Sequence, residues 1–279
     1  MEIILGFIIA VAIGITGVGA GVITAPVLIL FMHVSPAHAV GTALAFSVAV
    51  KILVVPMQIY RKQVNYRVLG YMLAGGIPGV LTGSYILAKL NTKGSSGILY
   101  SALGATVVIM AVANLYRLWF KPAPSVQRDW SRWLPAIALP IGAEVGFSSA
   151  GAGAIGSLAL LWLTPLSAAC VVGTDLFFGL CMSLIGSGFQ LSAGNYDGVI
   201  LTKLVIGGVV GAFAGTYVAA ITPQRAFRVV LSMWLITLGI QLCWSGVQQL
   251  QPDSASAPKA AMGSGRTAGT PASVPIAAK

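Results

Sequence analysis

Long apolar segments separated by short polar or basic stretches make up most of this chain. Each is long enough to cross the bilayer core, which takes about 20 residues as a helix. The period-two alternation that a membrane β-barrel requires is absent from them. The pattern therefore predicts an all-α integral membrane protein with about eight hydrophobic segments, at Ile3–Met32, Ala37–Tyr60, Val68–Ala88, Gly97–Leu118, Leu134–Leu163, Ser167–Leu191, Val199–Ile221 and Ala226–Val247.

The pattern occurs twice, at a constant offset of 132 residues. Gly19-Ala20-Gly21 returns as Gly151-Ala152-Gly153, and Val40-Gly41-Thr42 returns as Val172-Gly173-Thr174. Such duplication is typical of secondary transporters, whose two halves meet around one site near the bilayer midplane. We therefore expect a first transmembrane repeat, a basic connecting loop, a second transmembrane repeat and a disordered C-terminal tail, at 1–120, 121–133, 134–250 and 251–279.

The opening segment of each half is unusually long and rich in glycine. Glycine inside a helix costs about 1 kcal/mol relative to alanine, so clusters of it interrupt helices. Broken backbone at membrane depth is tolerated only where protein or a water-filled cavity satisfies its polar groups. We therefore expect Ile3–Met32 and Leu134–Leu163 to be broken helices or re-entrant hairpins, each followed by three helices.

The basic loop residues favour hairpins. If both opening segments cross the membrane, Arg225 and Arg228 lie outside with Lys89 and Lys93. If both are hairpins, Arg225 and Arg228 move to the basic, cytoplasmic side, as the positive-inside rule prefers. The second half is then inverted relative to the first.

Composition agrees with a membrane protein and limits the other classes. The chain is 57% hydrophobic and 8% charged, against about 25% charged in soluble domains. Its net charge of +10 comes from basic residues placed singly or in small groups between apolar segments, so no nucleic-acid partner is expected. Cys170, Cys181 and Cys243 are expected to be packing residues.

The two glycine-rich breaks are candidate substrate sites. A helix that restarts after such a turn presents free N–H groups and its positive dipole end, which suit an anion. Close packing of helices through small residues is the alternative, and we prefer it for Gly79, Gly83, Gly211 and Gly215. The candidate substrate-binding residues in the breaks are Thr16, Gly17, Gly19, Gly21, Ser148, Ser149, Gly151 and Gly153.

Three ionisable residues fall at membrane depth, where a functional role is the first hypothesis. Lys51 either binds the substrate, from a polar helix face that includes Ser47, or extends to the membrane surface. Asp175 either carries a coupling proton or pairs with Lys51, and Glu144 is either a proton carrier or a buried hydrogen-bond acceptor. Thr42 and Thr174, in the duplicated Val-Gly-Thr motif, are further candidate binding residues.

Several motifs together resemble the TauE/SafE family of sulfite and organosulfonate exporters. They are the run from Gly14 to Leu28, the segment from Val34 to Thr42, the basic turn from Tyr60 to Arg67, and their second-half counterparts from Gly146, Val172 and Gly194. The first run departs from the frequent three consecutive glycines at Ala20, and Ala43 stands where related chains can carry Asp. The resemblance implies a transporter of the bacterial inner membrane that needs no cofactor.

The expected function is transport of a small anion, with sulfite or an organosulfonate as the implied substrate, by alternating access around the two breaks. A passive channel for an anion or small neutral solute is the alternative. An enzyme is not expected, because the sequence contains no nucleophile–base or metal-ligand constellation. The expected partners are the lipid bilayer and the substrate, and a homo-oligomer is left open.

Overall fold

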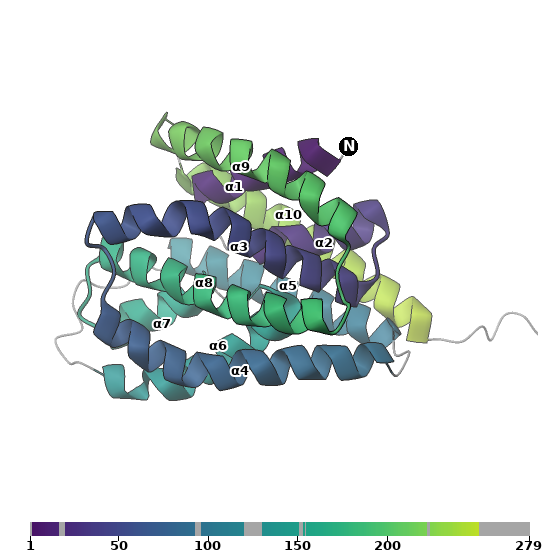
Figure 1. The fold of residues 1–279 in the computed structure, drawn as a ribbon, viewed down its shortest axis with the longest axis horizontal. Coiled ribbons are helices and arrows are strands. Elements are labelled where there is room, and N and C mark those ends of the chain that lie inside the picture. The colour runs from purple at the N-terminus through teal and green to yellow at the C-terminus, as the bar shows by residue number, and fades with distance from the viewer. Residues whose placement is uncertain are drawn as a thin grey trace, which may run out of the picture.

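The computed structural model describes residues 2–16, 20–92, 96–119, 130–150, 153, 155–221 and 224–250. The described secondary structure is entirely helical (Figure 1). The helices are α1 (Glu2–Thr16), α2 (Ala20–Met32), α3 (Pro36–Tyr60), α4 (Tyr66–Thr92), α5 (Ser96–Trp119), the 3-10 turn η1 (Ser131–Trp133), α6 (Leu134–Ser148), α7 (Ile155–Leu163), α8 (Ala168–Ser192), α9 (Gly198–Ile221) and α10 (Gln224–Leu250). The predicted tail, 251–279, and most of the predicted basic loop lie outside the described residues.

Six of these helices are long and apolar enough to cross a membrane: α3, α4, α5, α8, α9 and α10. The other two apolar segments are each divided, into α1 and α2 and into α6 and α7. With 15 residues, α1 is about 22 Å long, which is shorter than the hydrocarbon core of about 30 Å. The structure is therefore that of an α-helical, multi-pass membrane protein with two broken opening segments rather than eight uninterrupted spans.

Each opening helix packs against the opposite half of the chain. The most extensive helix contacts pair α1 with α9, α6 with α4 and α5 with α10. A Cβ on Gly79 of α4 would collide with the Leu139 carbonyl of α6, and a Cβ on Gly211 of α9 would collide with the Phe7 carbonyl of α1. These glycines therefore serve close helix packing, as predicted.

At the centre of the molecule, α3 and α8 run antiparallel (Figure 1). Gly41, near the start of α3, packs against Asn195, just beyond the end of α8. Lys51, further along α3, bonds to Ser183 in the middle of α8. Gly173, near the start of α8, packs against Gln63, beyond the end of α3. These two central helices carry half of the charged and polar candidates, namely Thr42, Lys51, Thr174 and Asp175.

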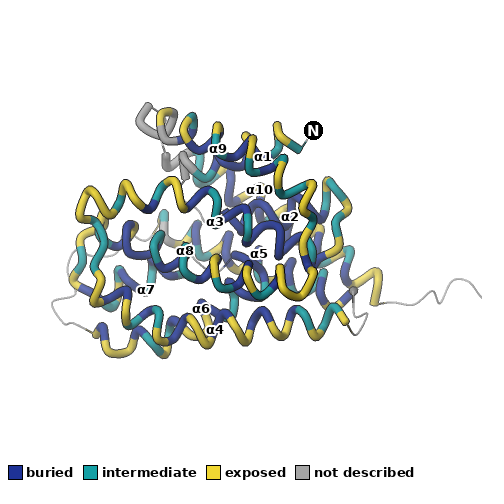
Figure 2. Tube along the Cα trace, viewed as in Figure 1, coloured by how far each residue is buried: buried dark blue, intermediate teal, exposed yellow. Residues whose placement is uncertain are grey.

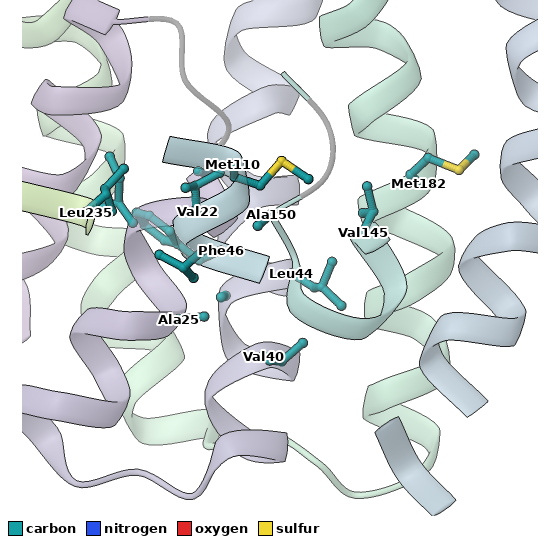
Figure 3. Packing of buried hydrophobic residues seen from close by; sticks show 14 of the residues in the cluster. Val22, Ala25, Val40, Leu44, Phe46, Met110, Val145, Ala150, Met182 and Leu235 are labelled. Carbon is teal, nitrogen blue, oxygen red and sulfur yellow. The ribbon is translucent and has the colours of Figure 1, made fainter. Parts of the chain in front are cut away.

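The helices α2 and α3 contribute most to the buried hydrophobic core, which also includes the inner faces of the other helices, and the outer helix faces are exposed (Figure 2). Phe46 of α3 packs over Gly208 of α9, and Phe178 of α8 packs over Gly76 of α4. Figure 3 shows Val22 of α2 and Phe46 among the packed residues. Many exposed side chains on the outer faces, such as Ile206 and Tyr217, are large and apolar, as expected of a surface that meets hydrocarbon.

Candidate functional site

The second break is a turn of defined geometry between α6 and α7. Ser149 ends α6 in the left-handed conformation, with φ of 66°, and its N–H donates to the Val145 carbonyl at 2.9 Å. Gly153 has φ of 113°, which favours glycine, and α7 begins at Ile155. The turn therefore contains Ser149 and Gly153, which the sequence pattern predicts to be substrate-binding residues.

The first break lies between Thr16, the last residue of α1, and Ala20, the first of α2. Gly17, Gly19 and the side chain of Thr16 lie outside the described residues, as does Gly151 of the second break. Gly21 is described and is buried in the first turn of α2. The first break is thus represented in the described site by Gly21.

The two breaks meet at Gly21 and Ser149. A Cβ on Gly21 would collide with the backbone oxygen and the Oγ of Ser149. Ser149 is only 6% exposed, and its Oγ has no hydrogen-bond partner among the described residues. The first N–H groups of a helix have no partner within that helix, and they carry its positive dipole end. A buried hydroxyl and the beginning of α2 therefore lie together at the junction, which combines donors suited to an anion.

Ser148 and Glu144 belong to a hydrogen-bond chain on the α6 side of the junction. The Ser148 hydroxyl donates to the Glu144 carboxylate at 2.6 Å and accepts from the Ala150 N–H at 3.2 Å. Ser148 is buried, whereas Glu144 is only partly buried. Of the two roles left open for Glu144, this geometry matches a hydrogen-bond acceptor, and Ser148 links it to the turn.

Lys51 is buried between α3 and α8. Its ammonium donates to the Gly179 carbonyl and to the Ser183 hydroxyl, both at 3.0 Å. Ser183 in turn donates to Ser47 at 3.3 Å. The Lys51 head group thus points into the protein and not toward the membrane surface. Lys51 and Ser183 are also counterparts in the repeat, 132 residues apart.

Asp175 connects α8 to α7. It is 4% exposed and accepts from the Ser157 hydroxyl at 2.6 Å, while Gly156 leaves room for the carboxylate. Among the described residues, the salt bridge within 4 Å joins Lys203 and Glu2, so Asp175 and Lys51 do not form a direct salt bridge. Asp175 instead lies one helical turn before Gly179, which accepts from Lys51.

The structure does not place Thr42 and Thr174 at the breaks. The Thr42 hydroxyl accepts from the Asp197 N–H at 3.1 Å, and the Thr174 hydroxyl accepts from the Asn65 N–H at 3.0 Å. Both threonines are fully buried. Thr42 of α3 anchors the loop that follows α8, and Thr174 of α8 anchors the loop that follows α3. The two hydrogen bonds are repeat counterparts, and they lie at opposite ends of the α3–α8 pair.

Sequence reasoning did not assign roles to Ser157 or Ser183, the partners of Asp175 and Lys51. The only signal for Ser183 was its place at the repeat position of Lys51. For a metal, the described residues contain no group of three His, Cys, Asp or Glu side chains that would hold an ion.

The six long apolar helices define the class as a multi-pass α-helical membrane protein. The family model described as "Sulfite exporter TauE/SafE" matches residues 2–242, and the chain belongs to this family. The resemblance inferred from the motifs is thereby confirmed.

Similar curated proteins come from Bacillus subtilis (strain 168). The "Probable membrane transporter protein YjnA" is 25% identical over 255 residues, which cover 86% of this chain and 98% of that protein. "Probable membrane transporter protein YunE" is 22% identical, covering 88% and 97%, and "Probable membrane transporter protein YdhB" is 25% identical, covering 86% and 98%. No solved structure matches the chain.

Proposed function

We propose that this protein is a secondary transporter of a small sulfur-containing anion, sulfite or an organosulfonate, in a bacterial inner membrane. The family description supports the substrate class. The observation that carries the proposal is the orphaned, buried Ser149 hydroxyl beside Gly21 at the beginning of α2. The charged oxygens of a sulfite or sulfonate group accept hydrogen bonds, so they complement a junction that offers donors.

The two halves are proposed to be inverted repeats with re-entrant opening hairpins. The antiparallel packing of α3 and α8, which are repeat counterparts, supports the inversion. Also in support, the link from α2 to α3 lies at the same end of the molecule as the N-terminus in Figure 1. In this arrangement the breaks approach the bilayer midplane from opposite faces.

This topology predicts that reporter fusions at residues 93 and 226 lie on opposite sides of the membrane. If the opening segments crossed the membrane instead, both positions would be on one side. Fusions of alkaline phosphatase and of a fluorescent protein at each position distinguish the two arrangements, and a common side for both would overturn the inversion.

In the proposed cycle, the anion binds between the breaks and its charge is balanced by Lys51, the buried cation of the central helix pair. Gly17, Gly19, Gly151, Gly153 and Thr16 complete the donor set. The two halves then rock to expose the site to alternate faces. Asp175 is our first candidate for the coupling proton, because it joins the second opening segment to the helix that holds Lys51. Glu144 is the second candidate.

Flux in proteoliposomes tests the proposal. Wild-type protein is expected to give saturable uptake or release of sulfite, taurine or sulfoacetate, whereas a passive channel would give flux proportional to concentration. Ser149→Ala removes one hydrogen bond to an anion, about 1.5–3 kcal/mol, so the half-saturating concentration should rise roughly 10- to 100-fold. Ser192→Ala, at the exposed end of α8, is the matched control. Equal flux by both variants would overturn the site.

A further inference from the structure

An apolar cavity of about 650 Å³ lies between α5, α6 and α7. Pockets that hold small molecules have volumes of about 300–1,000 Å³, so this one is large enough for a ligand. All of its lining residues are apolar or aromatic: Val108, Ile109, Val112, Ala113, Tyr116, Ile137, Ile155, Leu158, Ala159, Trp162 and Leu163. It is separate from the junction of Gly21 and Ser149.

A second hollow of about 260 Å³ adjoins this cavity and reaches Glu144. The two share Ile109, Ile137 and Ile155 in their walls. Glu144 is the only acidic or basic side chain among the described residues that line either of them. Together they form a largely apolar space with one carboxylate in its wall.

The larger cavity opens on the outer surface of the helices. Ile109, Val112 and Trp162 line it and are more than half exposed. Tyr116 and Trp162 meet edge to face, with ring centroids 6.4 Å apart, on its wall. Since this outer surface is apolar, a molecule dissolved in the bilayer can enter from the side.

Glu144 determines the chemistry of the occupant. The Ser148 hydroxyl donates to its carboxylate, and a carboxylate at membrane depth is costly unless it is paired or hydrogen-bonded. We propose that the cavity binds a membrane-dissolved amphiphile with a protonated amine head. Its apolar body lies along Trp162 and Ala159, and its ammonium pairs with Glu144. A neutral lipid chain would fill the same volume without using the carboxylate.

The corresponding region of the first half is packed differently. The repeat counterparts of α5, α6 and α7 are α10, α1 and α2. Most of α2 is buried, from Ala20 to Ile29, whereas the buried residues of α7 are Gly156, Ser157 and Leu160. The first half also lacks the charge, because Ala12 stands at the position that corresponds to Glu144. The cavity and its carboxylate are therefore features of the second half.

Binding is tested with the full chain in phosphatidylcholine nanodiscs, using dodecylamine and dodecanol as matched probes and tryptophan fluorescence as the readout. We expect dodecylamine to give a saturable change that Trp162→Phe removes. Dodecanol should bind at least tenfold more weakly. Equal behaviour of the two probes would overturn the proposal and would indicate an apolar groove filled by hydrocarbon alone.

Two variants separate charge from volume. Glu144→Gln should weaken dodecylamine at least tenfold and leave dodecanol unchanged. Ala159→Trp fills the cavity and should remove both responses, while Ala74→Trp, on the exposed face of α4, should remove neither. Size-exclusion profiles identify any variant that fails to fold. If Ala159→Trp does not fold, the binding of dodecylamine by Glu144→Gln decides the test. Unchanged dodecylamine binding by folded Glu144→Gln would reject the role of the carboxylate.

The same ligand should slow transport, because Glu144 is linked through Ser148 to Ala150 in the second break. This consequence rests on the proposed function, whereas binding does not. Saturable amine binding without inhibition of flux would leave the site standing and reject only its coupling to transport. If the wild-type protein shows no saturable flux in the absence of amine, the proposed function is rejected, but the amine site is not.

Discussion

The two opening segments of this chain share a sequence template but differ in packing. In the first, α2 has 13 residues and is buried along most of its length. In the second, α7 has nine residues, most of them only partly buried, and borders the 650 Å³ cavity. The contrast teaches that the duplication gives the two halves a common frame, within which burial and packing can still differ.

The differences fall at charged positions as well. Lys51 corresponds to Ser183, Asp175 corresponds to Ala43, and Glu144 corresponds to Ala12. The first half therefore provides the buried cation, and the second half provides both membrane-depth carboxylates. Lys51 and Glu144 can be changed without altering the contacts of Gly79 and Gly211 that pair the helices, whereas Asp175 packs against Gly156.

The largest expected effect comes from removing the cation. Lys51→Met keeps much of the side-chain volume and leaves an anion without its balancing charge, which costs about 2–5 kcal/mol, or roughly 30- to 5,000-fold in affinity. Saturable sulfite flux in proteoliposomes should be lost from protein that still elutes as a single folded species. Unaltered flux would remove Lys51 from the site.

Two further variants sharpen this test. Lys203→Met removes a partly exposed cation at the Glu2 salt bridge and should leave substrate affinity unchanged. The exchange of Lys51→Ser with Ser183→Lys moves the cation to the other side of the same contact, so it should recover part of the flux. No recovery in a folded double variant would mean that the first half must provide the cation.

The next effect compares the two breaks directly. Gly21→Ala inserts a methyl group against Ser149 and should cost about 1–3 kcal/mol of stability and abolish flux. Gly153→Ala forces alanine into a left-handed turn, which costs about 1–2 kcal/mol. Unfolding titrations in sodium dodecyl sulfate and flux measurements on the two variants test whether Gly21→Ala has the larger effect. A harmless Gly21→Ala would contradict the close approach of the breaks.

The smallest difference between the halves is expected where they are most alike. Thr42→Val and Thr174→Val each leave one loop N–H without its acceptor, at about 1–3 kcal/mol. The two losses of stability should be equal within about 0.5 kcal/mol, and Thr202→Val on an exposed helix face should cost less than that. A clear inequality between Thr42 and Thr174 would show that the two ends of the α3–α8 pair are not equivalent.

Much of the fold was predictable because it depends on local signals. Apolar length predicted the six long helices, and the glycine clusters predicted the interruptions after Thr16 and Ser148. The repeat also indicated that Gly79 and Gly211 are packing residues. These features follow from helix propensity and periodicity, which act over a few turns.

The site was less predictable because it depends on which helix faces meet. Thr42 and Thr174 were expected at the substrate site, but each holds a loop of the other half. A Lys51–Asp175 pair was one option, yet Lys51 bonds to Gly179 and Ser183 and Asp175 to Ser157. The cavity at Glu144 follows from the short, loosely packed α7, which no motif signals.

The contact between Lys51 and Ser183 has a consequence for how such a chain can arise. Consider a symmetric dimer built from two identical copies of one half. A residue that contacts its repeat counterpart in the present chain would there contact the same residue of the other copy. Two lysines there would place like charges about 4 Å apart, a repulsion of about 4 kcal/mol at an effective dielectric constant of 20. A solitary cation at this position therefore requires two halves of different sequence, as they are in this single chain.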